Sequence, residues 1–194
     1  MKQLILASAS PRRAELLRQI GLNFKIVVSN VSEDLPPQTT TPEQLVVALA
    51  LAKAKAAADR VREGVIIGAD TVVLLGNQVL GKPASPAEAA TMLKALSGKR
   101  HQVFTGIAIF EPVTGKLATD YAMTEVVLRP LAPAEIQAYV ATGEPLDKAG
   151  AYGIQGLGAV LVERIEGCYF NVVGLPLGKL VAMLQGFGIS IWQE

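Results

Sequence analysis

The stretch Leu4-Ile5-Leu6-Ala7-Ser8-Ala9-Ser10-Pro11-Arg12-Arg13 predicts a strand that leads directly into a capped helix. Ser10 suits the N-cap and Pro11 the first helical position, because proline lacks the N–H that would be unpaired there and its fixed φ fits the first turn. The apolar run before them reads as a strand. A strand followed at once by a helix favours an α/β protein when the same alternation continues along the chain.

Two arginines follow the proline, at the second and third helical positions. The helix dipole disfavours a cation at this end by roughly 0.3–1 kcal/mol for each charge. The placement is unfavourable unless an anion binds there, and phosphate suits backbone N–H groups, serine hydroxyls and guanidinium groups. The alternative is a surface helix whose arginines face solvent.

The rest of the chain continues the alternation. Helices are predicted at 11–20, 41–61, 85–98, 133–142 and 177–185, and strands at 4–6, 24–28, 65–75, 78–80, 102–110, 117–128 and 159–165. Capping-box spacing is present from Thr41 to Gln44 and from Ser85 to Glu88. The two long neighbouring strands look like a hairpin, so we expect a mixed α/β sheet with flanking helices rather than a purely parallel sheet.

Composition narrows the class of protein. A chain of 194 residues, 51% of them hydrophobic, fits one large domain or two lobes sharing a core. No apolar run reaches the ~18–20 residues of a membrane span. The apolar region in the first seven residues is too short for a signal peptide. Eighteen basic against seventeen acidic residues give no global field for nucleic acid or membrane. A single cysteine fits a reducing compartment, so a soluble cytoplasmic protein is expected.

Asp70 interrupts the apolar strand predicted at 65–75. An ionised carboxylate inside such a strand is costly unless it is paired, hydrogen-bonded or bound to a metal. Gly68 and Ala69 are small enough for another group to approach the backbone closely. The position suits a catalytic carboxylate or a Mg²⁺ ligand, and the alternative is an aspartate that caps a turn or pairs with a surface lysine.

Two further clusters carry polar residues between glycines. In Gly81-Lys82-Pro83 the lysine can touch a phosphate or hold Asp70 ionised, although such a sequence also marks an ordinary turn. The stretch 147–158 has four glycines in nine positions and reads as a loop built for close approach to a ligand. Its Gln155 can read a base edge, because an amide offers both a donor and an acceptor. The alternative is that the glycines only serve tight turns.

Nucleophilic catalysis has little support. His101 is the only histidine and is expected at the surface or in packing, and Cys168 has no cationic sequence neighbour to activate it. One histidine and one cysteine cannot build a Cys/His metal site. Lys53 and Lys55 lie two residues apart on a helix, so at most one of them should address a given cleft.

Taken in order, these clusters resemble the Maf family of nucleoside triphosphate pyrophosphatases over nearly the whole chain. The resemblance rests on the blocks Leu-Ala-Ser-Ala-Ser-Pro-Arg-Arg at the start, Gly68-Ala69-Asp70-Thr71, Gly81-Lys82-Pro83, Leu96-Ser97-Gly98, the stretch 147–156, and Val173-Gly174-Leu175-Pro176. Arg12, Thr71 and Gln155 match the branch that hydrolyses dTTP and UTP. The sister branch acting on 7-methyl-GTP has an aromatic residue and a glutamine at the first two of these positions.

The resemblance implies an α/β fold similar to the inosine triphosphate pyrophosphatases, with a deep cleft between two lobes of a single domain over 1–194, and a homodimer. It implies attack of water between the α- and β-phosphates, which yields a nucleoside monophosphate and pyrophosphate. Asp70 would be the proton acceptor, and Glu33 and Asp70 would hold a divalent cation, Mg²⁺ or Mn²⁺. The matching substrate-binding positions are Ser8, Arg12, Arg13, Lys53, Thr71, Lys82 and Gln155.

Two other classes stay open at the level of sequence. One is a nucleotide-binding regulator of a process such as cell division, which would need the same residues without the catalytic carboxylate. The other is a different phosphate enzyme, such as a monophosphatase or a purine-directed pyrophosphatase, which the reaction products would distinguish.

Overall fold

A mixed sheet organises the chain. The computed structural model describes residues 2–28, 31, 41–61 and 63–192. Within these residues seven strands form one sheet in the order β2-β1-β3-β5-β6-β7, with β4 paired to β3. The strands are β1 (Leu4–Leu6), β2 (Phe24–Ile26), β3 (Val65–Leu75), β4 (Gln78–Leu80), β5 (Arg100–Glu111), β6 (Lys116–Leu128) and β7 (Val162–Glu166).

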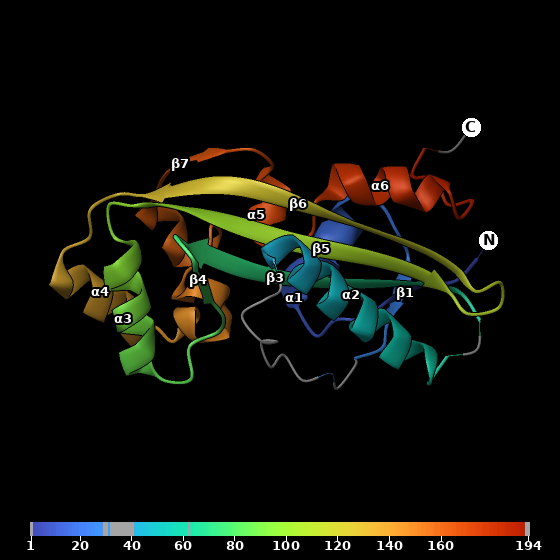
Figure 1. The fold of residues 1–194 in the computed structure, drawn as a ribbon, viewed down its shortest axis with the longest axis horizontal. Coiled ribbons are helices and arrows are strands. Elements are labelled where there is room, and N and C mark those ends of the chain that lie inside the picture. Colours follow the sequence, from blue (N-terminus) through green and yellow to red (C-terminus); the bar gives the residue numbers. More distant parts are fainter. Residues whose placement is uncertain (1, 29–30, 32–40, 62, 193–194) are drawn as a thin grey trace. The chain divides into compact units, whose positions relative to one another are not determined.

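Strand directions confirm the expected mixed sheet. β1 pairs in parallel with both β2 and β3, whereas β3 with β4 and β6 with β7 are antiparallel. β5 and β6 are sheet neighbours joined by a short turn, and Figure 1 shows them as two long ribbons side by side. They form the predicted hairpin, since only antiparallel neighbours can be joined so briefly.

Proline and hydroxyl residues start most of the helices. The helices are α1 (Pro11–Gln19), α2 (Pro42–Ala58), α3 (Pro86–Leu96), α4 (Pro133–Ala141), α5 (Tyr169–Val173) and α6 (Leu177–Gln185), with 3₁₀ turns η1 (Glu144–Asp147), η2 (Ala149–Ala151) and η3 (Gly156–Leu161). The sequence predicted five of the α-helices to within a few residues. It did not predict α5 or the 3₁₀ turns. The strand predicted at 159–165 begins only at Val162, because η3 takes up the residues before it.

The predicted caps differ in how completely they form. Thr41 and Gln44 make the full reciprocal box at the start of α2. At α3 only half of the box is present: Ser85 accepts from the Glu88 amide, while the Glu88 carboxylate accepts from the amide of Ala84. Ser10 is the N-cap of α1 and Pro11 the first helical residue, as expected.

The chain groups into two compact units, each made of stretches that are not contiguous. Unit 1 comprises Met1–Asp70, Thr105–Ala122 and Gly174–Glu194, and unit 2 comprises Thr71–Phe104 and Met123–Val173. In unit 1 the buried side chains of β1, β3 and β5 pack against alanines of α2. In unit 2 the core lies between α3, α4 and the facing strands, and Figure 1 shows α3 and α4 side by side.

Two glycines allow α2 to lie unusually close to the sheet of unit 1. A Cβ atom on Gly68 of β3 would stand 2.1 Å from the carbonyl oxygen of Ala50, and one on Gly106 of β5 would stand 2.2 Å from that of Val46. Neither distance is compatible with a side chain. Ala50, Ala54 and Ala57 on the same helix are fully buried, so small residues on both surfaces set the short spacing.

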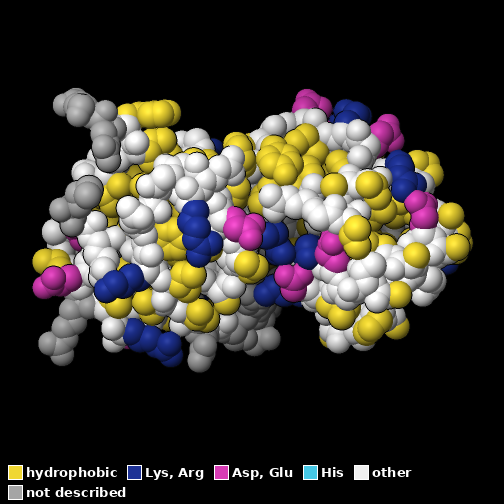
Figure 2. All heavy atoms as spheres, turned by 180° about the vertical axis from the view of Figure 1, so that it is seen from behind, with side chains coloured by type: hydrophobic (Ala, Val, Ile, Leu, Met, Phe, Trp, Pro, Cys, Tyr) yellow, Lys and Arg dark blue, Asp and Glu magenta, His cyan; other side chains and the backbone are white. Residues whose placement is uncertain are grey.

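Charged and apolar side chains are interspersed on one face of the molecule. Figure 2 shows Lys and Arg side chains next to Asp and Glu side chains on the face that it draws, with hydrophobic side chains between them. Among the described residues, none of the helices has both the length and the apolar character that crossing a membrane requires.

Candidate active site

A buried ion pair joins α2 to β3. The Nζ atom of Lys53 lies 2.5 Å from Oδ1 of Asp70, and the two residues are only 7% and 6% exposed. Asp70 was expected to need a partner inside an apolar strand, and its partner is Lys53. Lys55, two residues further along the helix, is exposed, so only one of the two lysines reaches this position, as predicted.

The glycine at position 68 explains how this pair forms. Gly68 brings the backbone of β3 against the backbone of α2 at Ala50. Ala50 lies about one helical turn before Lys53, and Gly68 lies two residues before Asp70. The small residues Gly68 and Ala69 predicted that another group would approach the backbone here, and that group is the protein's own helix. The close spacing lets the lysine reach the carboxylate without leaving the core.

Ser8 and Arg13 form a second contact within unit 1. The Arg13 Nη1 group donates to Oγ of Ser8 over 3.2 Å, and its Nε donates to the backbone oxygen of Gly174 over 2.8 Å. The Ser8 hydroxyl also accepts from the Ser10 amide over 3.2 Å. Both Ser8 and Arg13 are buried. Arg13 therefore ties the start of α1 to the segment before α6, a contact that was not predictable from the sequence.

The parallel register brings Ser8 near the strand that carries Asp70. Leu6 of β1 pairs with Ile67 of β3, and the Ala7 amide donates to the Ile67 oxygen. Ser8 is the second residue after β1, while Asp70 lies three residues beyond Ile67 on the neighbouring strand. Ser8, Arg13 at the start of α1 and the Lys53–Asp70 pair thus belong to the same region of unit 1.

The first turn of α1 keeps the positive character expected of an anion site. It contains no acidic residue, and the Ser10 side chain makes no cap hydrogen bond. Arg12 is half-buried at the second helical position. Thr71, the next residue after Asp70 on β3, is also half-buried.

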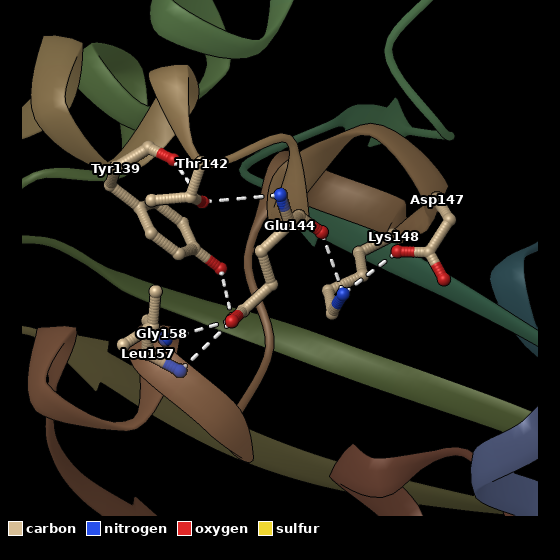
Figure 3. A network of polar contacts seen from close by, with 7 residues as sticks. All are labelled: Tyr139, Thr142, Glu144, Asp147, Lys148, Leu157 and Gly158. Atoms are coloured by element: carbon tan, nitrogen blue, oxygen red, sulfur yellow. Dashed lines mark hydrogen bonds and ion pairs between the residues drawn. The ribbon is translucent and has the colours of Figure 1, made fainter.

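Unit 2 brings the other two clusters together. The Gly150 amide donates to the Gly81 oxygen over 3.0 Å, so the glycine-rich stretch contacts the Gly81-Lys82-Pro83 turn. Lys82 is exposed, and Gln155 is half-buried just before η3. Glu144 and Tyr139, which the sequence analysis did not single out, hold the segment around Gln155 (Figure 3).

The glycines of this segment have neighbours within the protein. Gly150 has a φ of +69° and its Cβ would lie 3.0 Å from Val73, and a Cβ on Gly153 would lie 2.8 Å from the Lys148 side chain. A Cβ on Gly156 or Gly158 would meet Glu144 or Tyr139. The glycines therefore make room for the protein's own side chains, rather than only for tight turns.

The carboxylates proposed for a metal are only partly described. Glu33 lies outside the described residues. Within the described part of the chain, histidine, cysteine, aspartate and glutamate residues form no group of three or more that could hold a metal ion. Asp70 offers a hard oxygen donor of the type that Mg²⁺ and Mn²⁺ prefer, and a carboxylate paired to one lysine at Oδ1 still has further lone pairs.

The surroundings of His101 and Cys168 are those of structural residues rather than of catalytic nucleophiles. His101 is 2% exposed, with Nε2 2.7 Å from the Tyr152 hydroxyl and the two rings edge to face, so it is a packing residue. Burial lowers its pKa from 6.5 to about 4, which keeps it neutral at pH 7. Cys168 is a free, half-buried cysteine whose backbone amide and oxygen both bind the Thr124 hydroxyl.

Fold and site together define a mixed α/β protein with a buried lysine–aspartate pair on a sheet strand and an arginine-bearing helix N-terminus in the same unit. A family model described as "Maf-like protein" matches residues 3–187. The chain therefore belongs to the Maf-like family.

Curated relatives cover essentially the same length. A protein of Moorella thermoacetica named dTTP/UTP pyrophosphatase is 53% identical over 99% of this chain and 98% of its own. Proteins of the same name from Pelotomaculum thermopropionicum and Bacillus cereus are 48% and 49% identical over 98% of this chain, and over 100% and 93% of their own lengths.

Proposed function

We propose that this protein hydrolyses dTTP and UTP, and modified pyrimidine triphosphates, to the nucleoside monophosphate and pyrophosphate. The observation that carries the proposal is the buried Asp70–Lys53 pair, whose aspartate belongs to the motif Gly68-Ala69-Asp70-Thr71. The chain is also about half identical to proteins named dTTP/UTP pyrophosphatase. A buried ion pair is weak evidence for stability, because well-packed apolar residues often stabilise a core equally well. We therefore attribute the buried pair to the chemistry of the site rather than to stability.

Asp70 is the proposed proton acceptor from the attacking water. Hydrolysis of a phosphoanhydride depends on positioning, an oriented water and neutralised charge, and needs no covalent nucleophile. The proton goes from the water to the Asp70 carboxylate as the new P–O bond forms at the α-phosphorus and the bond to the pyrophosphate leaving group breaks. Lys53 balances the carboxylate and lends positive charge to the same region.

Cationic side chains are proposed to offset the charge of the triphosphate. Arg12 at the N-terminus of α1 and the exposed Lys82 are proposed to bind phosphate oxygens, with Ser8 as a neutral partner. Arg13 is proposed to do so too, while its Nε holds Gly174. Gln155 is proposed to read the base, and Thr71 is proposed to contact the substrate.

A divalent cation, Mg²⁺ or Mn²⁺, is part of the proposal. Asp70 and Glu33 would hold it, and the hard oxygen of the Asp70 carboxylate fits such an ion. When bound, the ion would neutralise phosphate charge and polarise the reacting phosphoryl group.

A triphosphate panel tests the proposal. Initial rates for dTTP, UTP, CTP and GTP are measured with purified protein and Mg²⁺ or Mn²⁺, with a chelator as the control. We expect dTTP and UTP to be preferred and the chelator to abolish turnover. A preference for GTP would favour a purine-directed enzyme, and tight binding without turnover would favour the regulator.

The proposal extends to assembly and location, for which we expect a cytoplasmic homodimer. Light scattering on the purified protein is expected to give twice the mass of one chain. A monomeric mass at micromolar concentration would contradict the dimer and leave the reaction unaffected.

A further inference from the structure

Glu144 stands at the centre of a polar network in unit 2 (Figure 3). Its Oε2 atom accepts from the Leu157 amide over 2.9 Å, and its Oε1 atom accepts from the Gly158 amide and from the Tyr139 hydroxyl, each over 2.9 Å. Both carboxylate oxygens are therefore used, and two of the three donors belong to the backbone just after Gln155.

The charge on Glu144 suits this arrangement. Burial raises the pKa of Glu144, but hydrogen bonds from the Gly158 and Leu157 amides and from Tyr139 outweigh it, so the pKa lies below its usual range. Glu144 is ionised at neutral pH. Hydrogen bonds to an ionised acceptor are about twice as strong as neutral ones.

Tyr139 links the two ends of the segment that carries Gln155. The Tyr139 hydroxyl donates to Glu144, and the backbone of Gly153 hydrogen-bonds to the Tyr139 hydroxyl oxygen. A Cβ on Gly158 would stand 2.5 Å from both the Tyr139 hydroxyl and the Gly153 oxygen. Gly153 and Gly158 are thus in close contact, and the four residues between them form a short excursion containing Gln155.

Lys148 holds the start of the excursion. Its ammonium donates to the Glu144 backbone oxygen over 2.6 Å and to Asp147 over 2.7 Å, and its stem fills the space beside Gly153. At the other end, Gly156 has a φ of +67° and leaves room for the Glu144 carboxylate. The conformation of the excursion is fixed from both sides by side chains that carry no assigned role.

We infer that Glu144, assisted by Tyr139, is a positioning residue that holds Gln155 in the orientation needed to discriminate the base. The inference rests on the proposed function. An amide can tell uracil from cytosine only if its donor and acceptor ends are fixed, since rotation of a mobile loop would let it satisfy either base.

The test is a double-mutant cycle on base discrimination. The ratio of kcat/KM for UTP to that for CTP is measured in the wild type, Glu144→Ala, Gln155→Ala and the double variant, because these substrates differ only in the base. We expect Glu144→Ala to lower the ratio ~10-fold, which corresponds to the free energy of about one hydrogen bond. The change should come mainly from a higher KM for UTP. In the Gln155→Ala background the same change should alter the ratio less than ~2-fold.

Two variants separate positioning from general damage. Tyr139→Phe removes one donor and leaves both amide contacts, so a smaller drop is expected. Glu163→Ala removes an exposed carboxylate of β7 in the same unit and should leave the ratio unchanged. Hydrogen exchange at the Leu157 and Gly158 amides should accelerate in Glu144→Ala and not in Glu163→Ala.

The outcomes distinguish this inference from the proposed function. A wild type that hydrolyses neither UTP nor CTP would defeat the function itself. If the wild type is selective and Glu144→Ala keeps its ratio, or lowers it equally with and without Gln155, the function stands and the positioning role is rejected.

Discussion

Asp70 shows how far a single position can be predicted from sequence. The apolar residues around it predicted burial, and burial predicted a partner or a ligand. The identity of the partner was not predictable, because a contact between α2 and β3 depends on how closely the helix packs. Lys82, named as a candidate from its turn, is exposed in unit 2, and the ion pair is made by Lys53.

Replacing Asp70 by asparagine tests its role as base. The amide keeps an oxygen for Lys53 and cannot accept a proton, so kcat for dTTP should fall more than ~10²-fold with little change in KM. Asp59→Asn, at an exposed carboxylate that ends α2, is the control and should be unaffected. Near-wild-type turnover of the Asp70 variant would exclude the assignment.

Gln155→Glu tests base selection at the residue proposed to carry it. The change removes the amide donor and adds a charge, so the ranking among dTTP, UTP, CTP and GTP should change more than kcat for the best substrate. Gln137→Glu makes the same replacement at an exposed position of α4 in unit 2; it is the control and should leave the ranking unchanged. An unchanged ranking would count against the role.

His101 predicts how stability depends on pH. Its folded pKa is about 4 against 6.5 when unfolded, so between these values the unfolded chain binds the extra proton. The stabilisation is fully present above pH 6.5 and falls by ~2–3 kcal/mol as the pH drops toward 4.5. Urea unfolding at pH 7 and 4.5 should show a smaller loss for His101→Gln, and equal losses would contradict this origin.

At the scale of elements, the close packing of α2 against the sheet, which Gly68 and Gly106 allow, brings Lys53 within reach of Asp70. Capping residues and prolines predicted where the helices begin, since these effects are local. The η1–η3 turns were missed because the glycines in and beside them interrupt any helical period, and α5 was missed because its five residues are too few to show one. Glu144 and Tyr139 were missed for a related reason: their contact with the Gln155 segment joins separate elements.

Gly68→Ala tests the close packing. The added Cβ would stand 2.1 Å from the Ala50 oxygen, so α2 must shift. We expect a loss of at least ~1–3 kcal/mol of unfolding free energy and a loss of activity, because Lys53 moves with the helix. Gly178→Ala in α6 meets open space and should change stability by less than ~1 kcal/mol. Equal effects of the two replacements would refute this explanation.

At the scale of the whole molecule, the sequence predicted a mixed α/β sheet and allowed two lobes, but it did not locate a boundary between them. β3, β5 and β6 each contribute residues to both compact units, so the chain passes between the units inside strands rather than through linkers. Composition and linker searches detect contiguous segments and cannot reveal such a division. Membership of the Maf-like family, by contrast, was predictable from motifs spread along the chain.

The most direct test of the proposed function is the product of dTTP hydrolysis in water enriched in ¹⁸O, with purified protein and Mg²⁺, analysed by ion-exchange chromatography and mass spectrometry. The predicted result is dTMP that carries the label, together with unlabelled pyrophosphate, as water attack at the α-phosphorus requires. Formation of dTDP and inorganic phosphate, or label in the pyrophosphate, would contradict it.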